Sequence, residues 1–143
     1  MKLGYQRQVE NYRHEDGSYS AWGDKFGNAE SGSTWLTAFV IRSFAQASKF
    51  ISVDNNVLET GIEFLKSCQD RTGKFIERGQ VFHSDMQSGT GSGDGLTVYV
   101  LISMLEASQA LGENYRCHGP KWTLKILKLF KVNRPQVTWA PHI

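Results

Sequence analysis

Two segments of this 143-residue chain, 60 positions apart, share nearly the same residue pattern. Residues 33–47 and 94–107 are both apolar and helix-like, with small and aromatic residues at matching positions. The matching pairs are Thr37 with Thr97, Phe39 with Tyr99, Val40 with Val100, Ser43 with Ser103, and Ala47 with Ala107. A repeated unit of this size cannot bury its apolar face alone and has to stack on its neighbours. The repeat therefore predicts part of a helical ring or solenoid.

A glycine turn that ends in an aromatic residue precedes each of these segments. Asp-Gly-Ser-Tyr occupies 16–19, and Thr-Gly-Lys-Phe occupies 72–75. Gly17 is available for the left-handed conformation that ends a helix. Glycine-rich polar loops, residues 20–33 and roughly 76–94, lead from each turn to the apolar segment. Each unit is therefore a helix, a turn, a loop and a second helix.

The helices of the two units are of two kinds. Residues 1–13 and 54–69 carry an apolar stripe along one side, which predicts half-buried helices. Residues 34–49 and 95–111 are apolar around most of the circumference, which predicts burial on more than one side. The stripes consist of Tyr5, Val9 and Tyr12 in the first helix and Leu58, Ile62, Leu65 and Cys68 in the other.

Outer helices that bury one face and inner helices that are covered all round are the pattern of a double-layered α/α ring. In such a ring Phe39 and Tyr99 face the interior. A plain helical bundle is the alternative, but it gives every helix one wet face and needs no repeat. The predicted fold class is therefore all-α, an incomplete part of an α/α toroid. Ser33 or Thr34 and Asp54 are expected as helix N-caps.

The end of the chain does not continue this pattern, so we divide the chain into 1–111, a partial ring domain, and 112–143, a divergent tail. The tail holds all three prolines and six Lys or Arg against one Asp or Glu. Its one helix candidate is the basic amphipathic stretch 124–131, of a kind that can lie on anionic membranes or partners. An aberrant end that packs poorly is the preferred interpretation.

Charge, hydropathy and cysteine content exclude several classes of function. Residues 1–112 carry ten Lys or Arg against thirteen Asp or Glu, so no nucleic-acid partner is expected. There is no run of 18 apolar residues, so no membrane span is expected. The first residues lack the apolar region of a signal peptide. Cys68 and Cys117 define no disulfide framework.

Six motifs follow one another in order along the first 110 residues. They are Gly-Tyr-Gln-Arg-Gln at 4–8, Asp-Gly-Ser-Tyr-Ser-Ala-Trp-Gly at 16–23, Gly-Ser-Thr-Trp-Leu-Thr-Ala-Phe-Val at 32–40, Phe-Ala-Gln-Ala at 44–47, Gly-Gln-Val-Phe-His-Ser-Asp-Met-Gln-Ser-Gly at 79–89 and Leu-Thr-Val-Tyr-Val-Leu at 96–101. Together they resemble the thioester domain of the complement/alpha-2-macroglobulin superfamily. Within it, the likeness is greatest to the insect thioester proteins and their membrane-anchored vertebrate relative.

The resemblance implies an α/α toroid of six helical hairpins, of which this chain supplies the part after the first helices. It also implies a secreted parent protein of innate immunity or endopeptidase inhibition, which is not an enzyme. Members carry an internal thioester between Cys and Gln of a Cys-Gly-Glu-Gln motif, and activation lets it acylate hydroxyls or amines of a target surface or protease. In the hydroxyl-preferring branch, a histidine first takes the acyl group, and the released thiolate then acts as base.

His83 is the position that matches this histidine. A neutral imidazole is a competent nucleophile near neutral pH, and a glycine-flanked loop can carry it toward an acyl group. Asp85 is a weaker candidate for orienting the ring. A solvated loop histidine without a role is the alternative interpretation.

The chain departs from the family in lacking the thioester motif. Cys68 is followed by Gln-Asp and Cys117 by His-Gly, so neither cysteine supplies the bond. The thioester segment is expected before residue 1, and covalent attachment by this polypeptide alone is not expected. The partners would be the target or protease of the parent and the parent's other domains. A ring that is cut open would expose buried helix flanks, which favours self-association.

A protein-interaction module without a thioester is a second class of function, and it would not depend on His83. Trp22 and Phe26 in the first loop are candidates for a protein-contact patch, although anchoring that loop is the simpler role. A third class is a triterpene-cyclase-like toroid, suggested by the spacing of Gln69, Gly73 and Phe75. The chain has no Asp-x-Asp-Asp or Asp-Asp-x-x-Asp motif for that chemistry, which ranks it last.

Zinc binding by Cys68, Asp70 and His83 is chemically possible, but Cys68 belongs to an apolar stripe and is better read as a core residue. The run His-Glu-Asp at 14–16 lies at a helix end, where polar residues are routine. We therefore expect no cofactor and no metal.

Overall fold

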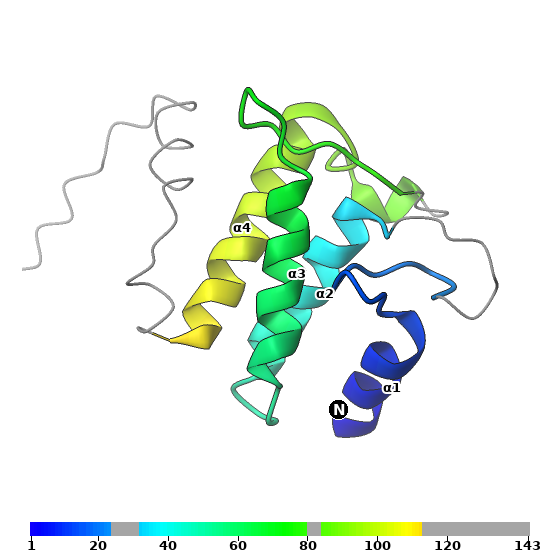
Figure 1. Ribbon diagram of the computed structural model, residues 1–143, viewed down its shortest axis with the longest axis vertical. Helices are drawn as coiled ribbons and strands as arrows, with labels where there is room; N and C mark the ends of the chain where they lie inside the picture. Colours follow the sequence, from blue (N-terminus) through cyan, green and yellow to red (C-terminus); the bar gives the residue numbers. More distant parts are fainter. Residues whose placement is uncertain (24–31, 80–83, 113–143) are drawn as a thin grey trace, which may run out of the picture.

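The computed structural model describes residues 1–23, 32–79 and 84–112, and over these residues the chain is all-α (Figure 1). The elements in chain order are α1 (Lys2–Tyr12), α2 (Thr34–Ala47), α3 (Asn55–Ser67), the 3-10 helix η2 (Ser84–Gln87) and α4 (Gly93–Leu111). Within the described ranges, β pairing is confined to isolated bridges in the turns, such as Gln69 with Phe75. The predicted all-α class is confirmed.

The N-caps that the sequence predicts are formed. The Ser33 side chain accepts a hydrogen bond from the Leu36 amide at 3.1 Å, and the Asp54 carboxylate accepts one from the Asn56 amide at 2.9 Å. The helix ends differ from prediction by about two residues, because α2 ends at Ala47, α3 ends at Ser67 and α4 begins at Gly93. The short helix η2 was not predicted.

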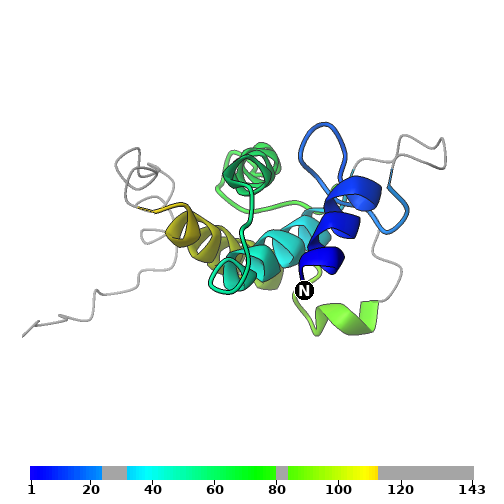
Figure 2. The same cartoon turned by 90° about the horizontal axis from the view of Figure 1, so that it is seen from below.

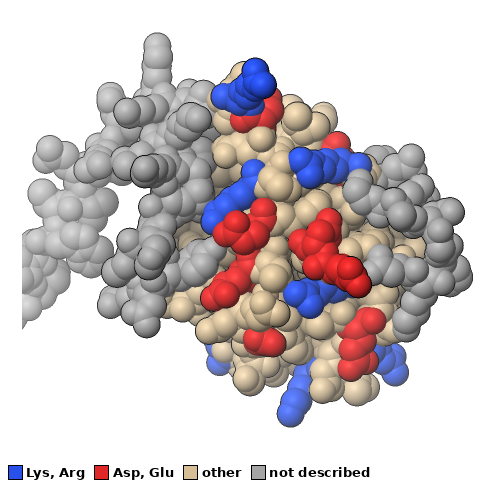
Figure 3. Space-filling model, in the orientation of Figure 1, with Lys and Arg blue, Asp and Glu red and all other residues tan. Residues whose placement is uncertain are grey.

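Helices α2 and α4 lie side by side, and α3 lies across one face of the pair (Figures 1 and 2). The approach of α3 to α2 is close, because a Cβ on Gly61 would lie 2.5 Å from the Cγ2 atom of Ile41. Helix α1 contributes the partly buried side chains of its predicted stripe, Tyr5, Val9 and Tyr12. On the face seen in Figure 3, acidic and basic side chains are interspersed.

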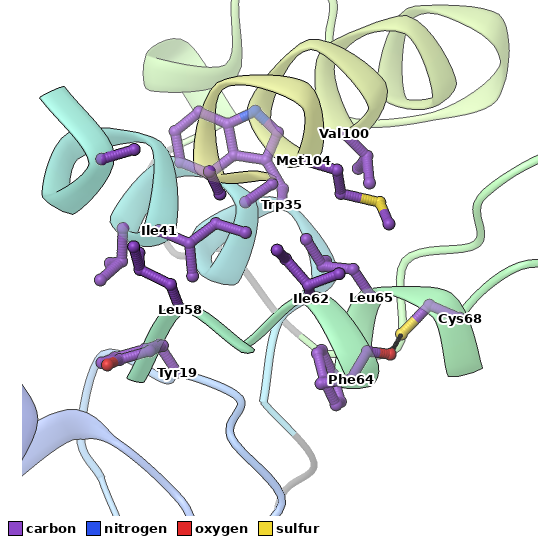
Figure 4. Packing of buried hydrophobic residues seen from close by; sticks show 14 of the residues in the cluster. Tyr19, Trp35, Ile41, Leu58, Ile62, Phe64, Leu65, Cys68, Val100 and Met104 are labelled. Carbon is purple, nitrogen blue, oxygen red and sulfur yellow. Dashed lines mark hydrogen bonds between the residues drawn. The ribbon is translucent and has the colours of Figure 1, made fainter. Parts of the chain in front are cut away.

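The core lies between α3 and the α2–α4 pair (Figure 4). Complete burial of an aliphatic side chain contributes about 1.5–3 kcal/mol relative to exposure. The buried stripe Leu58, Ile62 and Leu65 is therefore the main source of the free energy with which α3 packs on α2 and α4. The hydrophobic residues with the least exposure are Tyr19, Ala38, Ile41, Ile62, Leu65, Val100, Met104 and Ala107, each at 0%.

The repeat has an atomic basis in two equivalent threonines. The Thr37 hydroxyl accepts a hydrogen bond from the Tyr19 amide at 2.9 Å and donates one to the Ser33 carbonyl at 2.7 Å. The Thr97 hydroxyl accepts from the Phe75 amide at 3.1 Å and donates to the Gly93 carbonyl at 3.1 Å. Both turns bend through a glycine with positive φ, +84° at position 17 and +95° at position 73. Each unit therefore fixes its turn to its second helix by the same side chain.

The prediction that α2 and α4 are covered on all sides is wrong for one face. Phe39 is 40% exposed and Tyr99 is only half-buried. Val98, Ile102 and Leu105 are 41%, 42% and 45% exposed along one side of α4. The reason is that α3 covers only one face of the pair (Figure 2). We call Phe39, Val98, Ile102 and Leu105 the open face.

Candidate functional site

The segment between the second turn and α4 carries the residue that the resemblance assigns to acyl transfer. His83 itself lies outside the described residues, so its geometry stays a prediction. The structure does describe the two flanks of its segment, residues 76–79 on one side and 84–92 on the other. What can be established is how these flanks are held.

The first flank is held by Glu77, whose carboxylate lies at the N-terminus of α2. Its Oε1 atom accepts hydrogen bonds from the Thr34 amide at 2.7 Å and the Gly79 amide at 3.0 Å, and its Oε2 atom accepts one from the Trp35 amide at 2.9 Å. A carboxylate here also interacts favourably with the helix dipole, by up to about 2 kcal/mol when partly buried. Glu77 therefore joins the loop to a helix that begins 43 positions earlier.

The side chain of Thr34 adds a second pair of bonds to the same flank. Its hydroxyl donates to the Ile76 carbonyl at 2.8 Å and accepts from the Arg78 amide at 3.2 Å. The Arg78 guanidinium in turn donates to the Ser67 hydroxyl at 3.3 Å and to the Ser67 carbonyl at the end of α3. Residues 76–79 are thus held between the start of α2 and the end of α3.

The second flank is held by Trp35. Its indole N–H donates to the Thr90 hydroxyl at 2.9 Å, and the Thr90 amide donates to the Gln87 carbonyl at 2.7 Å. The indole ring is fixed by stacking on Phe39 and on Tyr99, with ring centroids 5.5 Å apart in each case. Figure 4 shows this indole between α2 and α4. Both flanks of the His83 segment therefore meet at the first turn of α2.

Sequence reasoning missed this arrangement. Glu77, Trp35 and Thr90 were assigned no role beyond loop or helix positions, and Thr34 was considered only as an N-cap. The bonds join residues more than 40 positions apart, so no local spacing signals them. Asp85, the predicted orienting residue, is exposed in η2, and its role toward His83 stays a prediction.

The residues considered for zinc have structural partners where the structure describes them. Cys68 is buried and donates to the Phe64 carbonyl at 3.4 Å, and burial raises the pKa of its thiol. The Asp70 carboxylate accepts from the amide and hydroxyl of Thr72 at 2.7 and 2.6 Å; the hydroxyl bond is the main reason that its pKa is lowered. Over residues 1–23, 32–79 and 84–112, no group of three or more His, Cys, Asp or Glu is placed to hold a metal. His83 lies outside these ranges.

The remaining candidates have turn and loop positions. The Nε2 atom of His14 lies 2.8 Å from the Ser20 hydroxyl, and the Asp16 carboxylate accepts from the Ser18 amide at 2.9 Å, as in an Asx turn. The side-chain amide of Gln69 donates to the Gly73 carbonyl at 2.9 Å, so the Gln-Gly-Phe spacing here ties a helix end to its turn. Trp22 is 58% exposed. Phe26 and Cys117 lie outside the described residues.

A second polar feature lies at the other end of α2 and α4. An open groove of about 670 Å³ is lined there mainly by Gln46, Lys49, Glu106 and Gln109. The Glu106 carboxylate is already bonded, to the Arg42 guanidinium at 2.9 Å and to the side-chain amide of Gln46 at 2.9 Å. The Arg42 bond is the main cause that lowers the pKa of Glu106. The carboxylate of Glu106 in this lining is thus already paired within the chain.

The comparisons with known proteins agree with the resemblance. None of the described helices is long and apolar enough to cross a membrane. The family model of the A-macroglobulin TED domain matches residues 1–121. Ovostatin of Gallus gallus is 42% identical over 110 residues, which are 76% of this chain and 7% of ovostatin. The match ends beyond residue 111, and the division into 1–111 and 112–143 stays a prediction. The chain belongs to the family of A-macroglobulin TED domains.

Proposed function

We propose that this chain forms part of the thioester domain of a secreted, alpha-2-macroglobulin-like protein that captures a protease or another target. The observation that carries the proposal is the family match over residues 1–121, together with the ovostatin relative. Because the chain spans only 7% of ovostatin, the activity belongs to a longer protein and not to this polypeptide alone. Covalent attachment would occur once for each thioester, without turnover, so the parent would not be an enzyme.

His83 is the acyl-transfer residue in this proposal. Its neutral imidazole would attack the thioester carbonyl, forming a cationic acyl-imidazolium and releasing the cysteine thiolate. A target hydroxyl would then attack the acyl group while the thiolate takes the hydroxyl proton, which frees the imidazole and leaves an ester. The anchored flanks of the His83 segment support this role, because an acyl-transfer residue has to be held near one position.

The test uses the full-length parent and measures incorporation of radiolabelled methylamine and glycerol after activation. His83→Ala should reduce glycerol incorporation and leave methylamine incorporation, because amines attack a thioester without the histidine step. His14→Ala is the control, since His14 lies at a turn that the proposal does not use. An unchanged ratio of glycerol to methylamine in His83→Ala removes the catalytic assignment. A Cys-Gly-Glu-Gln motif should also lie upstream in the parent, and its absence would exclude thioester chemistry.

A protein-interaction module is the second candidate, and the open face favours it. Four large apolar side chains, each at least 40% exposed, lie on α2 and α4. A patch of this kind is typical of a surface that packs on another domain or chain. The candidate partners are further domains of the parent, its target, or a second copy of the chain. In this case binding would be abolished by charged substitutions on the open face and would not depend on His83.

A further inference from the structure

We infer that this chain associates head to tail with a second copy of itself. In this contact, the exposed side of α4 in one copy packs on the exposed side of α2 in the other. We call Val98, Ile102 and Leu105 the α4 patch, and Phe39 with Ser43 the α2 patch. The inference rests on the second candidate function, for which it names the partner of the open face, and it does not depend on acyl transfer.

The packing of α2 on α4 within the chain shows how two units of the repeat fit together (Figures 1 and 2). On α2, the Arg42 guanidinium pairs with the Glu106 carboxylate of α4 at 2.9 Å. Ala38 and Ala45 are spaced four and three residues from Arg42, so they lie on the same side of the helix. They are 0% and 5% exposed. This side of α2 is therefore the side on which the next unit packs.

The α4 patch occupies the same positions in the second unit. Each of its residues lies 60 positions after a residue on that side of α2; the pairs are Ala38 with Val98, Arg42 with Ile102, and Ala45 with Leu105. In the first unit this side packs on α4, whereas Val98, Ile102 and Leu105 are 41%, 42% and 45% exposed. The α4 patch is therefore a contact side of the repeat that a further unit can cover.

The α2 patch is the complementary side of the same contact. Phe39 and Ser43 lie 60 positions before Tyr99 and Ser103 of α4. The Tyr99 ring stacks on Trp35 of α2 with ring centroids 5.5 Å apart, and Ser103 is 0% exposed. By contrast, Phe39 is 40% exposed and Ser43 is exposed. The α2 patch is therefore the side with which the second helix of a unit packs on the unit before it.

Helix α1 provides independent evidence for a neighbour beside α2. The turn bridges of the two units are 56 positions apart and align Val9 with Leu65 and Tyr12 with Cys68; these bridges are Arg13 with Tyr19 and Gln69 with Phe75. Leu65 and Cys68 are 0% and 2% exposed, because α3 packs on both α2 and α4. Val9 and Tyr12 are only half-buried. In the head-to-tail contact, α1 gains α4 of the other copy as its second support.

The charges of the two patches are compatible with burial. The contact within the chain contains the Arg42–Glu106 ion pair. Between copies, the matching positions hold Ile102 and Gln46, so both charges are replaced together and neither is left buried without a partner. Because the two patches differ, the contact is heterologous and leaves one free patch on each outer copy. Further copies can therefore add until a ring closes.

The experiment measures the mass of the full 143-residue chain by sedimentation velocity over a range of concentrations. The mean mass of the wild type should rise with concentration from the 16.1 kDa of one chain. Ile102→Glu in the α4 patch and Ser43→Glu in the α2 patch should each weaken self-association by about tenfold or more, because each places a charge in an apolar contact. Asn56→Glu is the matched control, since it adds the same charge at an exposed position of α3 and should associate like the wild type.

Mixing the two patch variants distinguishes a head-to-tail contact from other modes of association. The Ile102→Glu chain keeps its α2 patch and the Ser43→Glu chain keeps its α4 patch. Equal amounts of the two should therefore form a one-to-one complex, although neither variant associates alone. If Ser43→Glu associates alone, two α4 patches pair with each other and the inference is wrong.

The inference is also wrong if the wild type stays a monomer at every concentration, or if the mixture of variants does. The second candidate function is then decided separately, by whether the same two variants abolish binding of the parent to its target. The incorporation ratio of His83→Ala still tests acyl transfer by itself.

Discussion

Substituting the two equivalent threonines by valine tests whether the repeat is held together as the structure shows. Thr37→Val and Thr97→Val keep the β-branched shape and nearly the same volume, and each removes one hydroxyl. That hydroxyl is the hydrogen-bond acceptor for the amide of a buried turn residue, Tyr19 or Phe75. Tyr19 is 0% exposed and Phe75 is 4% exposed, so water cannot replace the lost acceptor without opening the turn.

The expected magnitude follows from these contacts. A buried donor that is left without a partner costs about 1–3 kcal/mol. The lost donation to the Ser33 carbonyl adds little, because that carbonyl still accepts from the Thr37 amide at 3.0 Å. Each variant should therefore lower the free energy of unfolding by about 1–3 kcal/mol, which is a large fraction of the 5–15 kcal/mol typical of a domain.

The measurement is urea denaturation followed by far-ultraviolet circular dichroism, with the slope checked for constancy between variants. Ser43→Ala is the matched control, because the Ser43 hydroxyl is exposed and only donates to the Phe39 carbonyl of its own helix. That control should stay within about 0.5 kcal/mol of the wild type. Threonine variants that are as stable as Ser43→Ala would refute the view that these hydroxyls join the turns to their helices.

Two further predictions concern single buried or exposed groups. Tyr19→Phe should be neutral or raise the melting temperature slightly, because the Tyr19 hydroxyl is buried without a hydrogen-bond partner in the described part of the chain; a loss of more than about 1 kcal/mol would show that this hydroxyl is bonded. Met104→Ala should cost about 2–5 kcal/mol, and the neighbouring Leu105→Ala much less, because Met104 is 0% exposed and Leu105 is 45% exposed on the open face. Equal losses of stability in these two variants would show that the open face is covered in solution.

The sequence was sufficient to predict the parts of the fold that depend on local chemistry. The caps Ser33 and Asp54, the positive φ of Gly17 and the buried stripe of α3 all follow from residue type and spacing. The 40% exposure of Phe39 could not be predicted from the sequence. An apolar residue type indicates a tendency to be buried, but it does not indicate which neighbouring element is present to cover it.

The site was less predictable than the fold, for a physical reason. His83 came from a resemblance, and its surroundings depend on bonds between residues that are distant in sequence. Glu77 looks like an ordinary polar loop residue, and Trp35 like an ordinary core residue. Only the folded chain places the Glu77 carboxylate against the Trp35 amide at 2.9 Å. Long-range capping of this kind has no periodicity that a sequence pattern can detect.

The same contacts suggest why the connection between the second turn and α4 has flanks at a junction between repeat units. The start of α2 is bonded to the turn of its own unit through Thr37 and to the next unit through Thr34 and Glu77. The start of α4 is bonded to its own turn through Thr97, but its cap Ser92 makes no side-chain bond to the helix. The second unit therefore supplies, through Glu77, hydrogen-bond acceptors for the first amides of α2 in the first unit. A loop that supplies such a cap has to pass close to the neighbouring unit, and this requirement fixes the flanks of the segment that contains His83.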